Sequence, residues 1–150
     1  MEPIVLFLRY DGSPTPIAHA PGVLTVSLTA TSCTVTTRIG EKTVDSEFRA
    51  IDGGTAKAET VLTLTGDGVF IESGTIRFGD GTTWLKFNTV GQGFLGPSAV
   101  KDVSAGCAVW RIVEGGGQFA GATGHVTGNF TVDAKGVAHD NQVAVIFPKT

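Results

Sequence analysis

The stretch that decides the fold runs over residues 114–124 and reads Glu-Gly-Gly-Gly-Gln-Phe-Ala-Gly-Ala-Thr-Gly, with five glycines around a single aromatic residue, Phe119. Residues 107–113 before it are rich in the side chains that suit a pleated, half-buried surface, and residues 125–133 after it alternate between polar and apolar. Glycine reaches backbone conformations that other residues avoid and allows a close approach of another chain segment. The segment therefore predicts a shaped turn between two strands, with Phe119 folded back over an apolar interior.

The composition of the rest of the chain extends this prediction to one all-β domain over residues 1–150. A chain of this length can bury a core without disulfides or metals. Its 41% of hydrophobic residues is too high for disorder, so the 21 glycines are expected in turns and bends. Short runs of Val, Thr, Ile and Phe recur about every dozen residues between glycine-containing turns, a spacing typical of β-sandwiches and barrels.

Nine runs have the character of strands, which is one more than a simple eight-stranded barrel requires. We expect the N-terminal run to be the additional one, either as an edge segment outside the barrel or as a barrel strand whose neighbour at 33–40 is a loop. The proline-rich residues 14–21 are expected to form a loop. The nine predicted strands lie near residues 4–10, 22–32, 42–51, 56–65, 68–79, 82–90, 106–113, 124–133 and 136–147.

The glycine-rich segment, with Phe119 and Ala122 after a Trp-bearing strand and before residues 126–132, resembles the C-terminal half of the allene oxide cyclase and dirigent-like barrels. The resemblance covers roughly residues 56–147. It implies an eight-stranded antiparallel up-and-down barrel of the calycin-like kind, with a small apolar cavity that binds or transforms a small hydrophobic molecule. It also implies a homodimer or homotrimer.

A second, shorter match concerns the first strand. Gly12-Ser13-Pro14 resembles a segment of the plant allene oxide cyclases whose Ser and Pro border the pocket, so Ser13 and Pro14 are expected to bind substrate. Residues 4–8 offer neither the Glu nor the Asn that those enzymes carry there. The resemblance therefore implies the barrel and its cavity rather than the cyclisation of an allene oxide.

Period-2 alternation predicts which side chains face the interior. Trp110 is expected inside and Trp84 outside, because they lie on opposite registers of their strands. Phe48, Phe87 and Phe130 are expected to form an aromatic wall with Trp110 around an apolar ligand. The predicted interior set is Leu24, Val26, Leu28, Val44, Ser46, Phe48, Leu62, Leu64, Leu85, Phe87, Trp110, Ile112, Val126, Phe130 and Val132.

Two polar positions are candidates for catalysis. Glu72 shares a face with Phe70 if the strand is regular, and burial would then raise its pKa enough for general acid or base catalysis. A bulge at Ser73-Gly74 would instead send Glu72 to water. His139 could act as a second catalytic group, and Asn141 on the same face could orient a ligand. The alternative is that both belong to a wetted strand end.

Several functions are excluded by the charge pattern and the apolar runs. A net charge of −3 with only 11 scattered Lys and Arg gives no basic stripe, so no nucleic acid partner is expected. The apolar runs are too short for a membrane span or a secretory core, which predicts a cytoplasmic protein without a membrane partner. Cys33 and Cys107 have no metal-binding spacing and are expected as free thiols, and no metal or cofactor is expected.

These observations favour a cofactor-independent cyclase or isomerase that acts on a small hydrophobic substrate, of polyketide, lipid or terpenoid type. Holding a flexible chain in a reactive shape can supply much of a barrier, so few polar groups suffice. The alternative is a non-catalytic carrier of a hydrophobic molecule. A third possibility is a filled barrel that serves only in assembly. The long connection at 91–106 could form a lid or a contact with another subunit.

Overall fold

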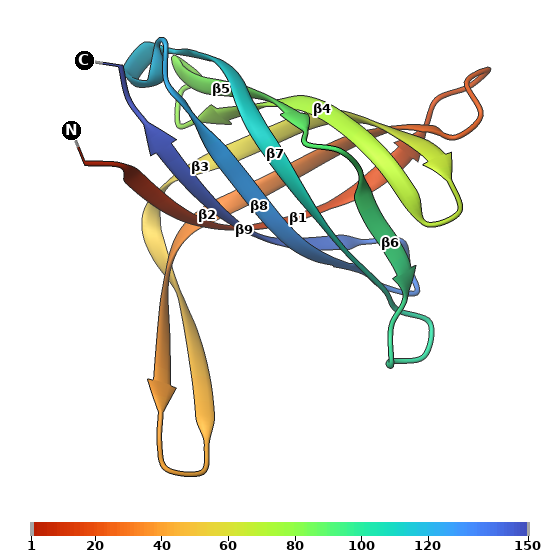
Figure 1. Cartoon of the computed structure of the whole chain (residues 1–150), viewed down its shortest axis with the longest axis horizontal. Helices are drawn as coiled ribbons and strands as arrows, with labels where there is room; N and C mark the ends of the chain where they lie inside the picture. The colour runs from red at the N-terminus through yellow and green to blue at the C-terminus, as the bar shows by residue number, and fades with distance from the viewer. Residues whose placement is uncertain (1, 150) are drawn as a thin grey trace.

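The computed structural model describes residues 2–149 and consists of antiparallel strands wound into a barrel, with one short 3-10 turn (Figure 1). Hydrophobic alternation and glycine-containing turns account for this all-β architecture. No helix in residues 2–149 is long and apolar enough to cross a membrane. The elements are β1 Ile4–Pro16, β2 Val23–Ile39, β3 Val44–Gly66, β4 Val69–Phe78, β5 Thr83–Thr89, β6 Gly93–Pro97, β7 Ser104–Gly116, η1 Gly117–Phe119, β8 Thr123–Val132 and β9 Ala138–Phe147.

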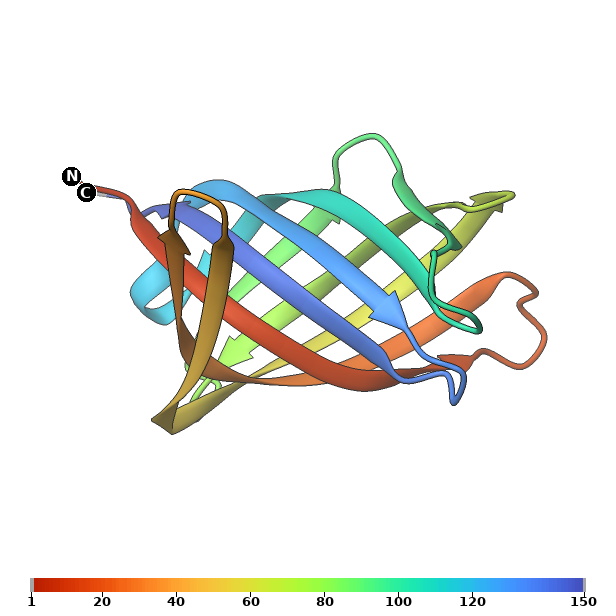
Figure 2. The same ribbon diagram turned by 90° about the horizontal axis from the view of Figure 1, so that it is seen from below.

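The barrel closes because β1 pairs with both β2 and β9, while β3 pairs with β4. Strands β5 and β6 each lie between β4 and β7, so they share one position in the wall. The nine strands thus fill eight positions, and the predicted eight-stranded antiparallel barrel is confirmed. The N-terminal run is a full barrel strand and not the additional one, because both of its edges are paired. The wall is seen from a second side in Figure 2.

The connection predicted at 91–106 is not a loop throughout, because it contains β6. Phe94 of β6 pairs with Cys107 of β7 and with Val69 of β4. The first strand is also longer than predicted and includes Pro14 and Pro16. Both prolines are tolerated there since they lie near the end of the strand, where fewer backbone donors are needed.

The glycine-rich segment forms the predicted turn. Gly115 and Gly116 extend β7, and Gly117 begins η1 with a φ of 60°, a conformation that favours glycine. Phe119 is buried, and its ring meets that of Phe78 edge-on with centroids 5.6 Å apart. The turn therefore covers one end of the barrel interior, as the sequence indicated.

Strands β2 and β3 continue beyond the barrel as a two-stranded hairpin, which projects away from the wall in Figure 1. We call residues 33–50 the arm. It begins at an irregularity in the β2–β3 ladder between Thr31 and Cys33. The predicted loop at 33–40 is therefore wrong, and the runs predicted at 42–51 and 56–65 belong to one strand. Alternation continues through the arm, so periodicity alone does not reveal where the chain leaves the barrel.

The barrel core follows the predicted alternation with one correction. Tyr10, Phe70 and Ile146 are completely buried, and the predicted interior residues of β2, β5, β7 and β8 face inward. Val44, Ser46 and Phe48 do not face the interior, because they lie on the arm, where Val44 is 70% and Phe48 43% exposed.

Candidate functional site

A cavity of about 150 Å³ lies inside the barrel and is almost entirely apolar. Its two ionisable groups are Glu72 from β4 and Asp140 from β9. A cavity of this size can hold a molecule such as benzene. The lining residues are Pro14, Leu24, Val26, Leu28, Leu62, Leu64, Phe70, Glu72, Leu95, Trp110, Phe130, Val132, Ala138 and Asp140.

Glu72 faces the interior because β4 is regular through Ser73 and Gly74. The pairing of β4 with β3 and with β5 shows no shift there, so the alternative of a bulge is wrong. Glu72 lies opposite the gap between β5 and β6, where the neighbouring strand is interrupted. The hydroxyl of Thr89 fills this gap, since it accepts a bond from the backbone N–H of Glu72 at 2.7 Å and donates to its carbonyl at 2.8 Å. The backbone of Glu72 is thereby satisfied at a break in the wall.

The carboxyl group of Glu72 is held by two donors. The Thr60 hydroxyl donates to Oε1 at 2.5 Å, and the indole Nε1 of Trp110 donates to Oε2 at 3.1 Å. Burial raises the pKa of Glu72 to about 7, although both hydrogen bonds oppose the rise and the negative charge of Asp140 adds to it. A carboxyl group with this pKa can donate or accept a proton near neutral pH.

Asp140 provides the second carboxyl group. Gln142 Nε2 donates to its Oδ2 at 2.7 Å, while Oδ1 has no hydrogen-bond partner among residues 2–149. Burial raises the pKa of Asp140 to about 6, and the bond from Gln142 opposes the rise. Tyr10 is the cross-strand neighbour of Asp140, and its buried hydroxyl also lacks a partner in the part of the chain that the structure describes. Burial, with the nearby charge of Asp140, raises the pKa of Tyr10, which keeps that hydroxyl protonated.

Trp110 and Phe130 border the cavity together with Phe70, whereas Phe87, also expected there, packs against Trp110 in the core and does not border it. Trp110 meets Phe87 edge-on, with centroids 5.7 Å apart. Phe130 packs against Phe70 at 5.9 Å and borders the cavity. The Trp110 ring lies over Gly128, where an added Cβ would come within 2.7 Å of the ring. A glycine at 128 is therefore needed for Trp110 to reach Glu72. Trp84 faces outward under Lys86, whose Nζ lies 5.4 Å from its ring.

The structure separates the two residues of the Gly-Ser-Pro segment. Pro14 borders the cavity, whereas Ser13 is exposed on the outer face of β1. Phe48 is also outside, because it belongs to the arm. Successive residues of a strand point to opposite faces, so Ser13 and Pro14 could not both line the same pocket.

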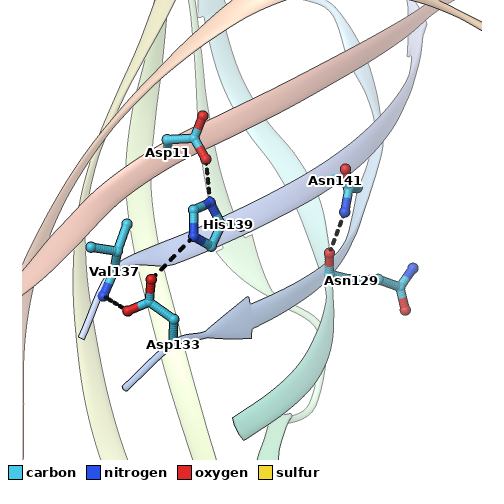
Figure 3. Close-up of polar contacts among 6 residues, drawn as sticks. All are labelled: Asp11, Asn129, Asp133, Val137, His139 and Asn141. Carbon is cyan, nitrogen blue, oxygen red and sulfur yellow. Dashed lines mark hydrogen bonds and ion pairs between the residues drawn. The ribbon is translucent and has the colours of Figure 1, made fainter. Parts of the chain in front are cut away.

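His139 and Asn141 share a face, but it is the outer face of β9 (Figure 3). His139 Nδ1 lies 2.5 Å from Oδ1 of Asp11, and its Nε2 lies 3.6 Å from Oδ2 of Asp133. The hydrogen bond with Asp11, together with Asp133, raises the pKa of His139. Asn141 donates to the backbone carbonyl of Asn129 at 3.5 Å. The predicted interior placement of both residues is wrong, and the alternative of a wetted strand end describes them.

Sequence reasoning missed Asp140, Gln142 and Tyr10 because it assigned β9 the opposite register. The outer face of β9 carries Val143 and Val145, which are larger than the alanines of the inner face. The available signal was the partner strand, since Tyr10 is inward and stands opposite Asp140. Aligning β9 with β1 so that Asp140 stands opposite the inward-facing Tyr10 would have placed this carboxyl group inside the barrel.

Comparisons with known proteins place the fold. No family model matches the chain, and no curated protein matches its sequence. Among solved structures, the chain is similar to the pterocarpan synthase dirigent protein GePTS1, with a TM-score of 0.50 and 18% sequence identity over 99% of this chain and 91% of that one. The part of the expected resemblance that concerns allene oxide cyclases has no support from this comparison. At this identity the likeness shows the fold alone, which is a dirigent-like eight-stranded barrel.

Proposed function

We propose that the barrel binds a small hydrophobic molecule and isomerises or cyclises it by proton transfer without a cofactor. The observation that carries the proposal is the presence of two carboxyl groups, Glu72 and Asp140, on one otherwise apolar cavity. Burying a carboxyl group is costly, and it raises the pKa of each of the two. Pairs of titratable groups with raised and different pKa values are typical of acid–base sites.

The two groups suit different roles. Near pH 7 Asp140 is mostly ionised, and its carboxylate, which borders the cavity, can take a proton from a bound molecule. Glu72 is about half protonated at that pH and can deliver a proton to another atom of the same molecule. One proton leaves the substrate and one is added, so the reaction is an isomerisation or a cyclisation. Exchange with water at the cavity mouth then restores both carboxyl groups.

The cavity limits what can react there. A volume of about 150 Å³ accommodates a group of roughly benzene size. The reacting part of the substrate would lie beside Trp110 and Asp140, and the rest would lie at the mouth near Pro14 and Leu95. A completely filled barrel, the third possibility raised by the sequence, is not supported, since this space remains open and Phe48 lies outside it.

The proposal can be tested with a nitrobenzisoxazole, a small aromatic probe that a carboxylate base opens by removing its ring C–H proton. The wild-type chain should cleave the probe faster than acetate does at equal carboxylate concentration. Asp140→Asn should lose this activity by roughly 100-fold or more, which is the usual contribution of a general base. Glu59→Gln, on an exposed carboxyl group of β3, serves as the matched control.

A carrier is the second candidate, and the apolar lining favours it. Fluorescence titration with indole-free aromatic ligands, comparing the wild type with Trp110→Phe, measures binding in the cavity. Binding measured in this way and cleavage of the probe together separate the two functions. Saturable binding that survives in Asp140→Asn, without any probe cleavage by the wild type, would support a carrier and contradict the acid–base role.

A further inference from the structure

The arm is amphipathic although it stands in solvent. One of its faces carries no charged side chain, and Ile39 and Val44 near its tip are 82% and 70% exposed. The opposite face is charged, with Glu47 bound to Arg38 at 3.3 Å and to Arg49 at 2.9 Å. The cross-strand pairs of the uncharged face are Cys33–Ala50, Val35–Phe48, Thr37–Ser46 and Ile39–Val44.

Nothing within residues 2–149 covers the apolar face of the arm toward its tip. An isolated two-stranded hairpin is marginally stable in water, and it gains stability from further strands or from another element packed on its apolar face. The two arm strands also have unpaired outer edges, since β1 pairs with β2 only up to Ser32 and β4 pairs with β3 only from Ala56. The arm therefore has the pattern of an element that packs against another surface.

A matching surface lies on the outside of the barrel. Phe7, Val143, Thr127 and Val109 are consecutive cross-strand neighbours on β1, β9, β8 and β7, and they form an uncharged band that we call the outer row. Phe7 and Val109 are 40% and 41% exposed. Beyond Val109 the row continues into a shallow groove of about 290 Å³ that is bordered by Val90 and Phe94.

The arm and the outer row meet at a corner. The guanidinium of Arg9, on the outer face of β1, lies 5.1 Å from the centre of the Phe48 ring. Cys33 Sγ lies 3.5 Å from the carbonyl oxygen of Phe7. The apolar face of the arm thus turns to the same side as the outer face of β1, and the two surfaces are continuous.

We infer that a second copy of this chain binds in this corner, with the arm of each copy on the outer row of the other. Each chain carries both apolar partners, so a two-fold contact buries both and leaves the charged face of the arm in water. The corner carries a single charge, the Arg9 guanidinium over the Phe48 ring, so it offers little to an ionic partner such as a nucleic acid.

The size of the two surfaces also favours a reciprocal contact. Seven residues on each of two strands span roughly 24 by 10 Å. One such contact falls well short of the roughly 800 Å² that each partner buries in a stable interface. When each copy contributes one arm and one outer row, the contact doubles to roughly 480 Å² per copy, which is the size of a weak, reversible interface.

The experiment measures the mass of the full chain by sedimentation over a range of concentrations. The arm variant Ile39→Lys with Val44→Lys is compared with Thr34→Lys plus Thr36→Lys, which adds the same charge to the opposite face. The row variant Val109→Lys is compared with Ser73→Lys, an exposed outer position on β4. Apart from Val109, these side chains are polar or at least 70% exposed, and circular dichroism would verify that every variant keeps the barrel.

We expect a wild-type dimer whose dissociation constant rises by at least roughly tenfold in both the arm and the row variants. The two controls should remain dimeric. An equimolar mixture of the arm and row variants should regain part of the association, because one intact arm then meets one intact row.

Three results would overturn the inference. The first is a monomeric wild type, including one that floats with phosphatidylcholine vesicles instead of associating with itself. The second is a dimer that persists in the arm variant. The third is a dimer that the row variant leaves intact, since the arms would then contact some other surface. None of these results depends on the acid–base role of the cavity.

Discussion

The indole Nε1 of Trp110 on β7 donates a hydrogen bond to Oε2 of Glu72 on β4, 3.1 Å away across the barrel interior. This bond connects the aromatic wall of the cavity to its acid. It favours the ionised carboxylate and therefore opposes the effect of burial on the pKa of Glu72. The position of the Trp110 ring thus helps to set the pH range in which Glu72 can transfer a proton.

Replacing Trp110 by Phe should raise the pKa of Glu72 above its present value of about 7. The variant loses the donor to Oε2 but keeps most of the apolar contact area. Nuclear magnetic resonance of the Glu72 carboxyl carbon measures the change directly. Trp84→Phe, on the outside of the wall, should leave the titration unchanged. An unaltered pKa in Trp110→Phe would show that the hydrogen bond contributes nothing to the electrostatics of the site.

Glu72→Gln should change how stability depends on pH. The folded-state pKa of about 7 lies above the ordinary 4.5, so the folded protein binds a proton that the unfolded chain releases between these values. The stabilisation that this bound proton gives the folded protein is complete below about pH 4.5 and is lost as the pH rises to about 7. With a shift of this size, the ionised group costs about 3 kcal/mol at pH 8.

Urea unfolding at pH 4.5 and pH 8 would check this prediction. Relative to the wild type, Glu72→Gln should gain stability at pH 8 compared with pH 4.5. Glu59→Gln should show no such difference, because that carboxyl group is 59% exposed and faces water. If the free energy of unfolding changed equally between pH 4.5 and pH 8 in the two variants, Glu72 would not be desolvated in the folded protein.

The barrel and one of its two carboxyl groups could be predicted from the sequence. Glycine-containing turns and period-2 alternation indicate the number of strands. Around Glu72 they leave two alternatives, a regular strand with Glu72 inside or a bulge at Ser73-Gly74 with Glu72 in water. Neither alternative could be excluded, because Gly74 is compatible with a bulge and the compensating Thr89 lies on another strand. The register is decided by the pairing of β4 with β3 and β5, and no local sequence pattern contains that information.

The second carboxyl group and the arm could not be predicted, for related physical reasons. On β9 the outer face is as apolar as the inner one, with Val143 and Val145 outside and Ala144 and Ile146 inside. On the arm, alternation continues outside the barrel. In both places hydrophobic side chains lie on a surface, and this pattern resembles a core. Alternation therefore predicts His139 and Asn141 inside, which turns Asp140 outward, and it predicts Phe48 inside.

Asp11→Asn should lower the stability of the β8–β9 hairpin end at low pH. The pKa of His139 is raised chiefly by its hydrogen bond with Asp11, so this contact stabilises the fold fully below about pH 6.5 and is lost as the pH rises through the folded pKa. Thermal unfolding at pH 5.5 should therefore show a larger loss than at pH 9. Asp67→Asn, in an exposed turn, is the control. An equal loss at both pH values would assign the effect to something other than His139.

Gly128→Ala should close part of the cavity and displace the aromatic wall. An added Cβ would lie 2.7 Å from the Trp110 ring and 2.8 Å from Oδ1 of Asp140, so at least one of these groups must move. Overpacking of this kind costs about 1–3 kcal/mol. Because Trp110 holds Glu72 and Asp140 is the second carboxyl group, ligand binding and probe cleavage should both fall. Gly96→Ala is the matched control, since no atom lies within 4 Å of a Cβ at that position. Calorimetry of each variant, with and without a small aromatic ligand, separates the loss of stability from the loss of binding, and a Gly128→Ala variant that retains both would show that the Trp110 ring does not need this glycine.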